Sequence, residues 1–486
     1  MSAELERLAA GCLLAGFKGA SAPDWLRRWL EAGLGGVVLF AWNVESRSQV
    51  AELTAALRSE RDGLVVAIDE EGGDVTRLEA AAGSSYPGNW ALGAVDDPAL
   101  TESVASAIGA DLAGVGVNLN LAPVADVNVD PLNPIVGIRS FGSDPGLVAR
   151  HVAAFVTGVQ GAGVAACAKH FPGHGDTRED SHLELPVVRR DDEAMAAMLL
   201  PFRAAVQADV RAVMTAHVRI QGLDDAPATL SRAAITGLLR DELGFTGLAI
   251  TDALEMRAVS ATFGVEEGAI RALEAGADAL CLGAELRPEA LHSAVVDAVR
   301  SGRLPEERLR EAAARVHALS NGVQGQSLDA APENVGLEAA RRALVVDGDV
   351  ALTRPPLVIE LLPEASIAAG AARHGLADML RSADVVRLHG EPLDPRALAE
   401  AHYGRQVVVV LRDAHRHTWQ RVAADGLLDA APDSVLVEVG VPAWQPDRAN
   451  YVATRGAGRV NLEAAAERLQ PSDRIVSRYA RTSARS

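Results

Sequence analysis

Eight short apolar runs recur over the first 320 residues, and each is separated from the next by a segment long enough to form a helix. Strands of almost continuous apolar character are typical of parallel sheets whose faces are covered by helices. Strand and helix in regular alternation predict a (β/α)8 barrel of the TIM type for residues 1–320. The runs are Leu13–Phe17, Gly36–Phe40, Leu64–Ile68, Val117–Leu121, Val164–Ala168, Ala212–Thr215, Leu248–Thr251 and Ala279–Leu282.

Polar and ionisable side chains stand at or just beyond the ends of several of these runs. Barrel enzymes build their active sites at the carboxyl ends of the strands, so these side chains are candidates for one common site. They are Asp69, Asp126, Lys169, His170, His217 and Asp252.

A second alternation of strands and helices begins after a polar stretch that contains glycine and proline. We interpret residues 321–335 as an interdomain linker and residues 336–486 as a smaller αβα layered domain with a mostly parallel sheet. No glycine-rich phosphate fingerprint follows its first apolar run, so nucleotide binding is not supported. The expected strands are Leu357–Leu362, Val385–Leu388, Val407–Leu411 and Val435–Val439.

The acidic balance of the chain restricts the classes of partner that it can bind. The formal charge is -19 at pH 7, and a protein of that sign is repelled by nucleic acid and by anionic membrane surfaces. No apolar run is long enough to span a bilayer. These observations argue against nucleic-acid-binding and membrane-spanning functions.

The segment that ends at Cys12 superficially resembles a lipoprotein cleavage site. Glu4, Glu6 and Arg7 leave no room for the apolar core of a signal peptide, so we expect a cytoplasmic protein. The three cysteines of the chain lie far apart among apolar neighbours. We expect buried thiols rather than a disulfide framework or a thiolate metal site.

Residues 169–182 carry three histidines, two aspartates and a lysine directly after an apolar run. Proline and glycine in this segment break both helix and strand patterns, so we expect a loop rich in titratable groups. A metal site is disfavoured because no HExxH-type spacing is present. Asp180 and His182 are the favoured pair, since a carboxylate beside an imidazole fixes its tautomer and yields a proton donor near neutral pH.

This segment, which ends in Asp180-Ser181-His182, closely resembles the loop of the glycoside hydrolase family 3 β-N-acetylglucosaminidases of the bacterial peptidoglycan-recycling type. Other family 3 enzymes, such as β-glucosidases, share the Lys-His dipeptide but generally lack the Asp-Ser-His ending. The resemblance extends over nearly the whole barrel and is specific below family level. Further segments that are similar to family blocks, in the same order, are 68–78, 122–142, 214–217, 227–231 and 250–256.

The resemblance implies a retaining, exo-acting hydrolase that needs neither a metal nor an organic cofactor. Asp252 would be the nucleophile, and His182 would be the general acid/base with Asp180 as its orienting partner. Retention requires one carboxylate that traps the oxocarbenium-like transition state and a second group that protonates the leaving oxygen. The residues implied to bind the terminal sugar are Asp69, Arg77, Arg139, Lys169 and His170.

The implied reaction is the removal of terminal, nonreducing β-linked N-acetylglucosamine from a small glycan or glycopeptide. A phosphorylase that uses the same intermediate is the alternative, because a neutral histidine does not repel phosphate as an anionic glutamate would. A noncatalytic sugar-binding protein is disfavoured, since binding alone needs no nucleophile. Peptidoglycan fragments and chitobiose are not distinguished as substrates, and no oligomeric state is predicted.

Two positions depart from the pattern that the family commonly shows. Glu70 stands where glutamine is common, and Asp74 stands where a basic residue is common. An acidic pair at the rim of the site can alter which leaving groups are accepted.

Overall fold

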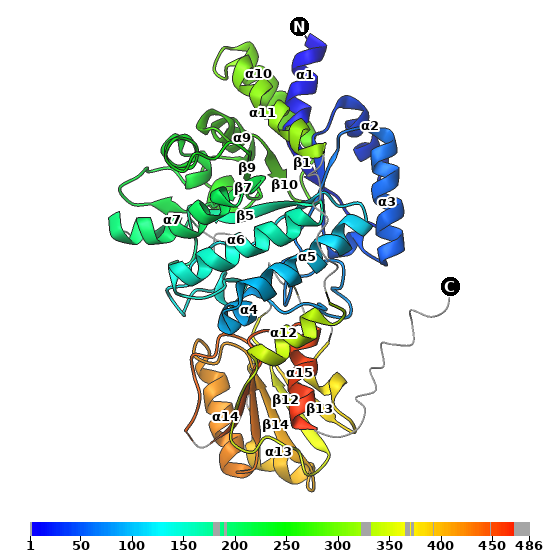
Figure 1. The fold of residues 1–486 in the computed structure, drawn as a ribbon, viewed down its shortest axis with the longest axis vertical. Helices are drawn as coiled ribbons and strands as arrows, with labels where there is room; N and C mark the ends of the chain where they lie inside the picture. Colours follow the sequence, from blue (N-terminus) through cyan, green and yellow to red (C-terminus); the bar gives the residue numbers. More distant parts are fainter. Residues whose placement is uncertain are drawn as a thin grey trace. The chain divides into compact units, whose positions relative to one another are not determined.

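The computed structural model describes residues 2–177, 185–188, 192–321, 332–364, 370, 374–391, 393–447 and 449–470. The chain divides into two compact units (Figure 1). The first comprises Met1–Glu71, Asp97–Val136 and Ser140–Pro332, and the second comprises Gly72–Asp96, Gly137–Arg139 and Glu333–Ser486. Most of the expected linker, 321–335, lies outside the described residues.

The first unit contains a nearly closed parallel sheet of eight strands in the order β10-β1-β2-β3-β4-β5-β7-β9. A parallel bridge between Ile250 and Ala279 links the two ends of this order. The predicted (β/α)8 barrel is thus confirmed, with one strand for each of the eight apolar runs. The strands are β1 (Leu13–Gly16), β2 (Gly36–Leu39), β3 (Val65–Ile68), β4 (Leu119–Asn120), β5 (Ala165–Phe171), β7 (Ala212–Thr215), β9 (Leu248–Thr251) and β10 (Leu280–Leu282).

Helices cover the outside of this sheet, and α5 and α6 lie side by side along it (Figure 1). Both begin at an aspartate whose side chain accepts a backbone N–H, Asp97 from Leu100 and Asp144 from Leu147, followed by a proline in the first turn. The helices are α1 (Ser2–Gly11), α2 (Asp24–Ala32), α3 (Arg47–Glu60), α5 (Pro98–Gly114), α6 (Pro145–Gly161), α7 (Asp192–Gln207), α8 (Arg257–Ser260), α9 (Val265–Ala275), α10 (Pro288–Arg300) and α11 (Glu306–Ser320), with a π-helical segment at Ala233–Glu242.

Alternate residues of the barrel strands form a closely packed interior core. Cys167 and Cys281 belong to this core, and all three cysteines of the chain are buried and free. The expectation of buried thiols is therefore confirmed. No helix among the described residues has both the length and the apolar character needed to cross a membrane.

A buried carboxylate, Asp278, ties the amino-terminal end of the barrel together. It is fully buried, accepts the backbone N–H of Ala249 at 3.0 Å, and forms ion pairs with three arginines. Arg240 lies at 2.5 Å and Arg315 at 3.0 Å, and Arg308 completes the set. Several charge-assisted bonds offset the cost of burying this anion, so this end of the barrel is specialised for stability.

The second unit contains a six-stranded sheet in the order β11-β16-β15-β14-β12-β13, parallel except for the β11–β16 pair. The expected layered domain is present, and its sheet includes two strands that we did not predict, β11 and β16. The strands are β11 (Val345–Asp347), β12 (Pro356–Leu361), β13 (Asp384–Leu388), β14 (Gln406–Leu411), β15 (Val435–Glu438) and β16 (Asn450–Ala453). Its helices are α4 (Asn89–Val95), α12 (Val335–Ala343), α13 (Pro395–Ala401), α14 (Thr418–Ala430) and α15 (Arg459–Leu469).

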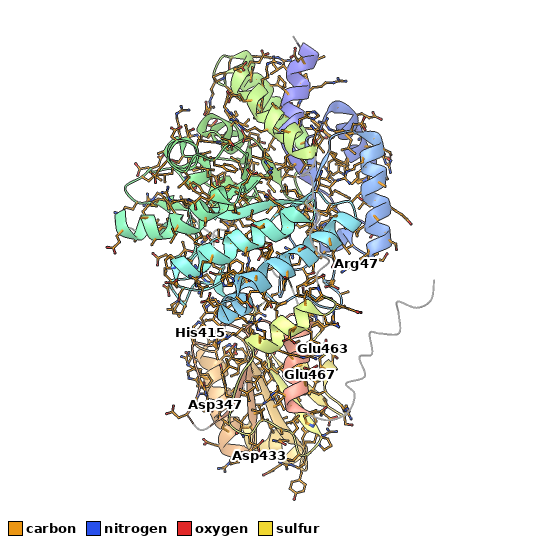
Figure 2. The ribbon with its side chains drawn as sticks, in the orientation of Figure 1. Arg47, Asp347, His415, Asp433, Glu463 and Glu467 are labelled. Atoms are coloured by element: carbon orange, nitrogen blue, oxygen red, sulfur yellow. The ribbon has the colours of Figure 1, made fainter. Side chains whose placement is uncertain are left out.

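An acidic side chain of α15 connects this helix to α12. Figure 2 labels Glu463 and Glu467 on α15. Arg341 of α12 donates two hydrogen bonds to Glu467, at 2.7 and 2.5 Å, and this bidentate geometry holds α12 against α15.

Glu438, at the end of β15, is fully buried in the second unit. Its carboxylate accepts three backbone N–H groups, from Asp413 at 2.8 Å, Gly440 at 2.7 Å and Ala414 at 3.2 Å. Burial and the neighbouring Asp413 charge outweigh these donors and raise the pKa of Glu438 to about 7. The group therefore takes up a proton in the folded protein at a pH where it is ionised in the unfolded chain.

We predict that the stability of the second unit falls as the pH rises from about 4.5 to 7, and then levels off. A carboxyl whose pKa is higher in the folded state contributes stability at low pH and loses it through this window, by about 3 kcal/mol for this shift. Hydrogen exchange of β14 and β15 peptides measures this. Glu438→Gln should flatten the pH dependence, exposed Glu400→Gln should not, and an unchanged slope in Glu438→Gln would contradict the prediction.

Candidate active site at the carboxyl end of the barrel

Lys169 is the central cation at the carboxyl end of the barrel strands. It lies on β5, its side chain is only 2% exposed, and its Nζ is 2.7 Å from both Asp69 Oδ1 and Glu71 Oε1. Asp69 follows β3 and remains 19% exposed, whereas Glu71 is buried. Asp69 and Lys169, two of the candidates at the strand ends, are thus in direct contact. Glu71 is a third member that we did not predict.

Asp126 organises the beginning of the loop that follows β5. It is fully buried, and its Oδ2 lies 2.7 Å from Nδ1 of His170. It also accepts the backbone N–H groups of His170 at 3.3 Å and of His174 at 2.6 Å. Burial alone would raise the pKa of Asp126, but His170 and His174 outweigh it and lower that pKa. Because the carboxylate can only accept, Nδ1 of His170 carries the proton of this hydrogen bond, which fixes the orientation of the ring.

His174 and Gly175 hold the shape of this loop. The His174 ring is buried, its Nδ1 lies 2.7 Å from the Thr177 hydroxyl, and burial lowers its pKa to about 4. A Cβ on Gly175 would lie 1.8 Å from the carbonyl oxygen of Val127, so only glycine fits at this close approach. A buried, neutral His174 is a structural residue and not a proton donor at neutral pH.

The start of the expected loop differs from the prediction. We expected the strand to end at Ala168, but β5 continues through Phe171, which pairs with Thr215 after a register irregularity. The bonds Lys169–His170 and Phe171–Pro172 are both cis. Lys169 and His170 therefore project from the end of a strand, and the loop proper begins after them.

Asp252 lies directly after β9 and is partly exposed. Its Oδ1 accepts the backbone N–H of Ala253 at 2.8 Å, and its own N–H donates to the Thr215 carbonyl at 3.2 Å. The next carbonyl, of Ala253, accepts from Nε2 of His217 at 3.0 Å. These bonds position the carboxylate at the strand end, and His217 acts by holding the segment that follows Asp252.

The charged groups at this end of the barrel affect the pKa of the buried thiol of Cys167. Burial raises the pKa of Cys167 to about 12, Lys169 opposes that rise, and Asp69 and Asp252 add to it. The same three residues stand at the carboxyl ends of β5, β3 and β9, which are strands of one parallel barrel, so Lys169, Asp69 and Asp252 lie at the same end of it. A cation between carboxylates at a strand edge is suited to bind hydroxyl groups and to keep a carboxylate ionised.

Glu255 is a further carboxyl near Asp252 that we did not single out, although it stands three residues later in the same block. A Cβ on Gly283 would lie 1.6 Å from Glu255 Oε1, so the absent side chain makes room for this carboxylate. Its buried Oε2 has no hydrogen-bond partner among the described residues. Burial raises the pKa of Glu255, and the charge of Asp252 adds to the effect. Glu255 can therefore hold a proton beside Asp252.

The roles of four predicted site residues stay predictions. Asp180 and His182 lie outside the described residues. Arg77 and Arg139 belong to the second compact unit, and their part in the site stays a prediction.

Asp74, also in the second unit, forms an ion pair with Arg412 and accepts the N–H of Ala457 at 2.7 Å. Asp74, which departs from the family pattern, therefore binds residues of its own unit.

The chain is similar to known proteins in sequence. The sequence model described as the glycosyl hydrolase family 3 N terminal domain matches residues 21–319. Beta-hexosaminidase A of Pseudoalteromonas piscicida is 36% identical over 331 residues, which cover 62% of this chain and 55% of that relative. Beta-hexosaminidase of Stenotrophomonas maltophilia is 38% identical over 291 residues, which cover 58% of this chain and 86% of the relative.

A solved family 3 beta-N-acetylglucosaminidase from Paenibacillus sp. strain FPU-7 superposes with a TM-score of 0.86 and 34% identity. The match covers 96% of each chain, so it includes both units. The family match alone covers more than half of the sequence. The resemblance that the motifs indicated is confirmed, and the chain belongs to glycosyl hydrolase family 3.

Proposed function

We propose that this chain is a retaining exo-β-N-acetylglucosaminidase. It removes terminal nonreducing N-acetylglucosamine and transfers it to water through a covalent intermediate on Asp252. His182, oriented by Asp180, is the general acid and base. Asp69, Lys169 and His170, together with Arg77 and Arg139, bind the sugar, and neither a metal nor an organic cofactor takes part.

The observation that carries this proposal is the grouping of Lys169, Asp69 and Asp252 at one end of a family 3 barrel. Relatives named beta-hexosaminidase, 36% and 38% identical, support the choice of an N-acetylated sugar. The match over 96% of a beta-N-acetylglucosaminidase supports it further.

The proposed reaction has two steps. Asp252 attacks the anomeric carbon while His182 donates its proton to the departing glycosidic oxygen, which leaves a glycosyl ester and a neutral imidazole. His182 then takes a proton from water, the water oxygen forms the new bond to the anomeric carbon, and the Asp252 carboxylate is released. Two inversions at that carbon leave the product with the anomeric configuration of the substrate.

His182→Ala should reduce activity far more with a poor leaving group than with a dinitrophenyl leaving group. Only the poor leaving group needs a proton in the transition state, and general acid catalysis contributes about 10²–10⁴-fold. Steady-state kcat/KM on both aryl N-acetylglucosaminides measures the contrast, with Asp180→Asn as the companion that disturbs orientation alone. Equal losses on both substrates would remove His182 from the acid role.

The pocket should also form hydrogen bonds with the 2-acetamido group of the sugar. A site that hydrogen-bonds a substrate group rejects an analogue that lacks it by about 10⁴-fold. We therefore expect kcat/KM on an aryl β-N-acetylglucosaminide to exceed that on the matching β-glucoside by several orders of magnitude. Comparable efficiency on the two substrates would overturn the named sugar while leaving the family 3 mechanism in place.

The acceptor is tested separately, because a neutral His182 does not repel phosphate and a phosphorylase would share the first step. Products are followed by NMR as phosphate is raised at constant ionic strength. Free N-acetylglucosamine, released first with retained configuration, supports the hydrolase. Accumulation of a sugar 1-phosphate would make the chain a phosphorylase.

We further propose a cytoplasmic location and a role in peptidoglycan recycling. Three buried, unpaired thiols fit a reducing compartment. Activity on small peptidoglycan-derived disaccharides, compared with chitobiose, tests the substrate.

A further inference from the structure

A cavity of about 300 Å³ lies at the amino-terminal end of the barrel. Its walls come from α1, from the turn that joins α3 to β3, and from α11, which runs beside α1 (Figure 1). α1 precedes β1 and the turn after α3 precedes β3, so the cavity is on the face opposite to the strand ends that carry Lys169 and Asp252. The proposed glycosidase reaction does not use it.

The polar lining of this cavity is cationic. Arg7, Arg61, Arg310 and His317 line it, and the described lining residues include no aspartate or glutamate. Arg310 is already neutralised, since it contacts Glu4 at 2.5 Å and Glu306 at 2.8 Å. The remaining positive charge comes from Arg7 and Arg61. A concentration of positive charge stands out in a chain whose formal charge is -19.

Arg7 and Arg61 make no hydrogen bond or ion pair with any residue in the described part of the chain, and Nε of Arg61 is buried without an acceptor. The two side chains converge on Gly33, where an ideal Cβ would lie 3.2 Å from Arg61 Nη1 and 3.5 Å from Arg7 Cγ. Burial lowers the pKa of Arg61, and the charge of Arg7 adds to this effect. A buried donor without an acceptor costs about 1–3 kcal/mol, which an anion in the cavity would recover.

We propose that this cavity binds a small phosphate monoester. Guanidinium groups present two parallel N–H donors that match phosphate oxygens, and two such groups lining one cavity balance a dianion. The cavity has about ten times the volume that a water molecule occupies in the liquid, so it has room for an organic group beside the phosphate. Apolar side chains of Leu8, Ala313 and Val316 line the remaining wall and suit that group.

The test is calorimetric titration of the full chain with glycerol 3-phosphate, inorganic phosphate and malonate at constant ionic strength. Wild type should bind glycerol 3-phosphate with saturation, and Arg7→Gln and Arg61→Gln should each weaken binding by about tenfold or more. Arg28→Gln, at an exposed position on α2 outside the cavity, should bind like wild type. All three variants should keep glycosidase turnover and thermal midpoint close to wild type.

Each outcome decides the proposal. Equal affinity for inorganic phosphate and the ester supports the site and makes the phosphate group its whole determinant. No saturable binding by wild type overturns it, as does binding that Arg7→Gln and Arg61→Gln leave unchanged. Tighter binding of malonate than of either phosphate also overturns it. Because the readout is binding and not turnover, failure here leaves the proposed glycosidase function untouched.

Discussion

Asp252→Ala is expected to lower kcat by about 10⁴-fold with little change in substrate affinity. The variant keeps the proposed contacts of Asp69, Lys169 and His170 to the sugar but cannot form the proposed glycosyl ester. Asp252 is suited to this role because its carboxylate is partly exposed and held by the Ala253 N–H. Lys169 and Asp69, at the same end of the barrel, favour one bound pyranose in front of it.

Three measurements check this prediction. Steady-state kinetics on a dinitrophenyl N-acetylglucosaminide give kcat, and binding of the reaction product by calorimetry shows whether the pocket is intact. Mass spectrometry after treatment with a 2-fluoro glycosyl probe identifies the labelled carboxylate. Asp241→Ala removes an exposed carboxylate from the π-helical segment and should change kcat less than twofold. Labelling of Glu255 in place of Asp252 would reassign the nucleophile.

The barrel could be predicted from sequence because each of its strands is buried on both faces. Apolar runs such as Leu64–Ile68 and Leu248–Thr251 carry that burial in their own composition. The two strands of the second unit that were not predicted, β11 and β16, carry weaker signals. β11 is three residues long and β16 four, and β16 begins with a partly exposed Asn450. Their strand character comes from pairing with each other and with β15, which no local pattern reports.

The sequence also did not predict that residues 72–96 and 137–139 belong to the second unit. Both segments lie between strands of the barrel in chain order, and their neighbours in sequence belong to the first unit. Membership in a compact unit depends on contacts between distant residues, such as Asp74 with Arg412. Composition and periodicity describe only near neighbours along the chain.

Most of the described site could be predicted because its residues stand at the carboxyl ends of the barrel strands. Asp69, Lys169 and Asp252 stand where parallel strands deliver side chains to one edge, so their approach follows from the barrel itself. Glu71 and Glu255 were missed, because each stands three or four residues beyond the end of its strand and reads as an ordinary loop residue. A signal for the central cation was present: Lys18 and Lys169 are the only lysines in the chain, in which arginine otherwise supplies the positive charge.

Lys169→Met is the second change with a large expected effect, and it should damage stability and catalysis together. Lys169 is 2% exposed and bridges Asp69 and Glu71 at 2.7 Å each. Removing it leaves two carboxylates facing each other, one of them buried, and breaking a buried ion pair in this way costs about 3–5 kcal/mol. The same loss removes a proposed sugar ligand, so we expect kcat/KM to fall by about 10³-fold beyond any loss from unfolding.

The other lysine supplies the matched control. Lys18 pairs with Glu285 at the surface, with side chains 62% and 78% exposed, so Lys18→Met should cost less than about 1 kcal/mol and leave kcat/KM unchanged. Urea unfolding gives the stability difference, and kinetics at a temperature where both variants are folded give the catalytic one. A double variant, Lys169→Met with Glu71→Gln, separates the two effects. It should regain much of the lost stability because one buried anion is gone, while kcat/KM stays low because the cation proposed to contact the sugar is still absent. Recovery of both quantities together would mean that Lys169 acts only by holding the fold.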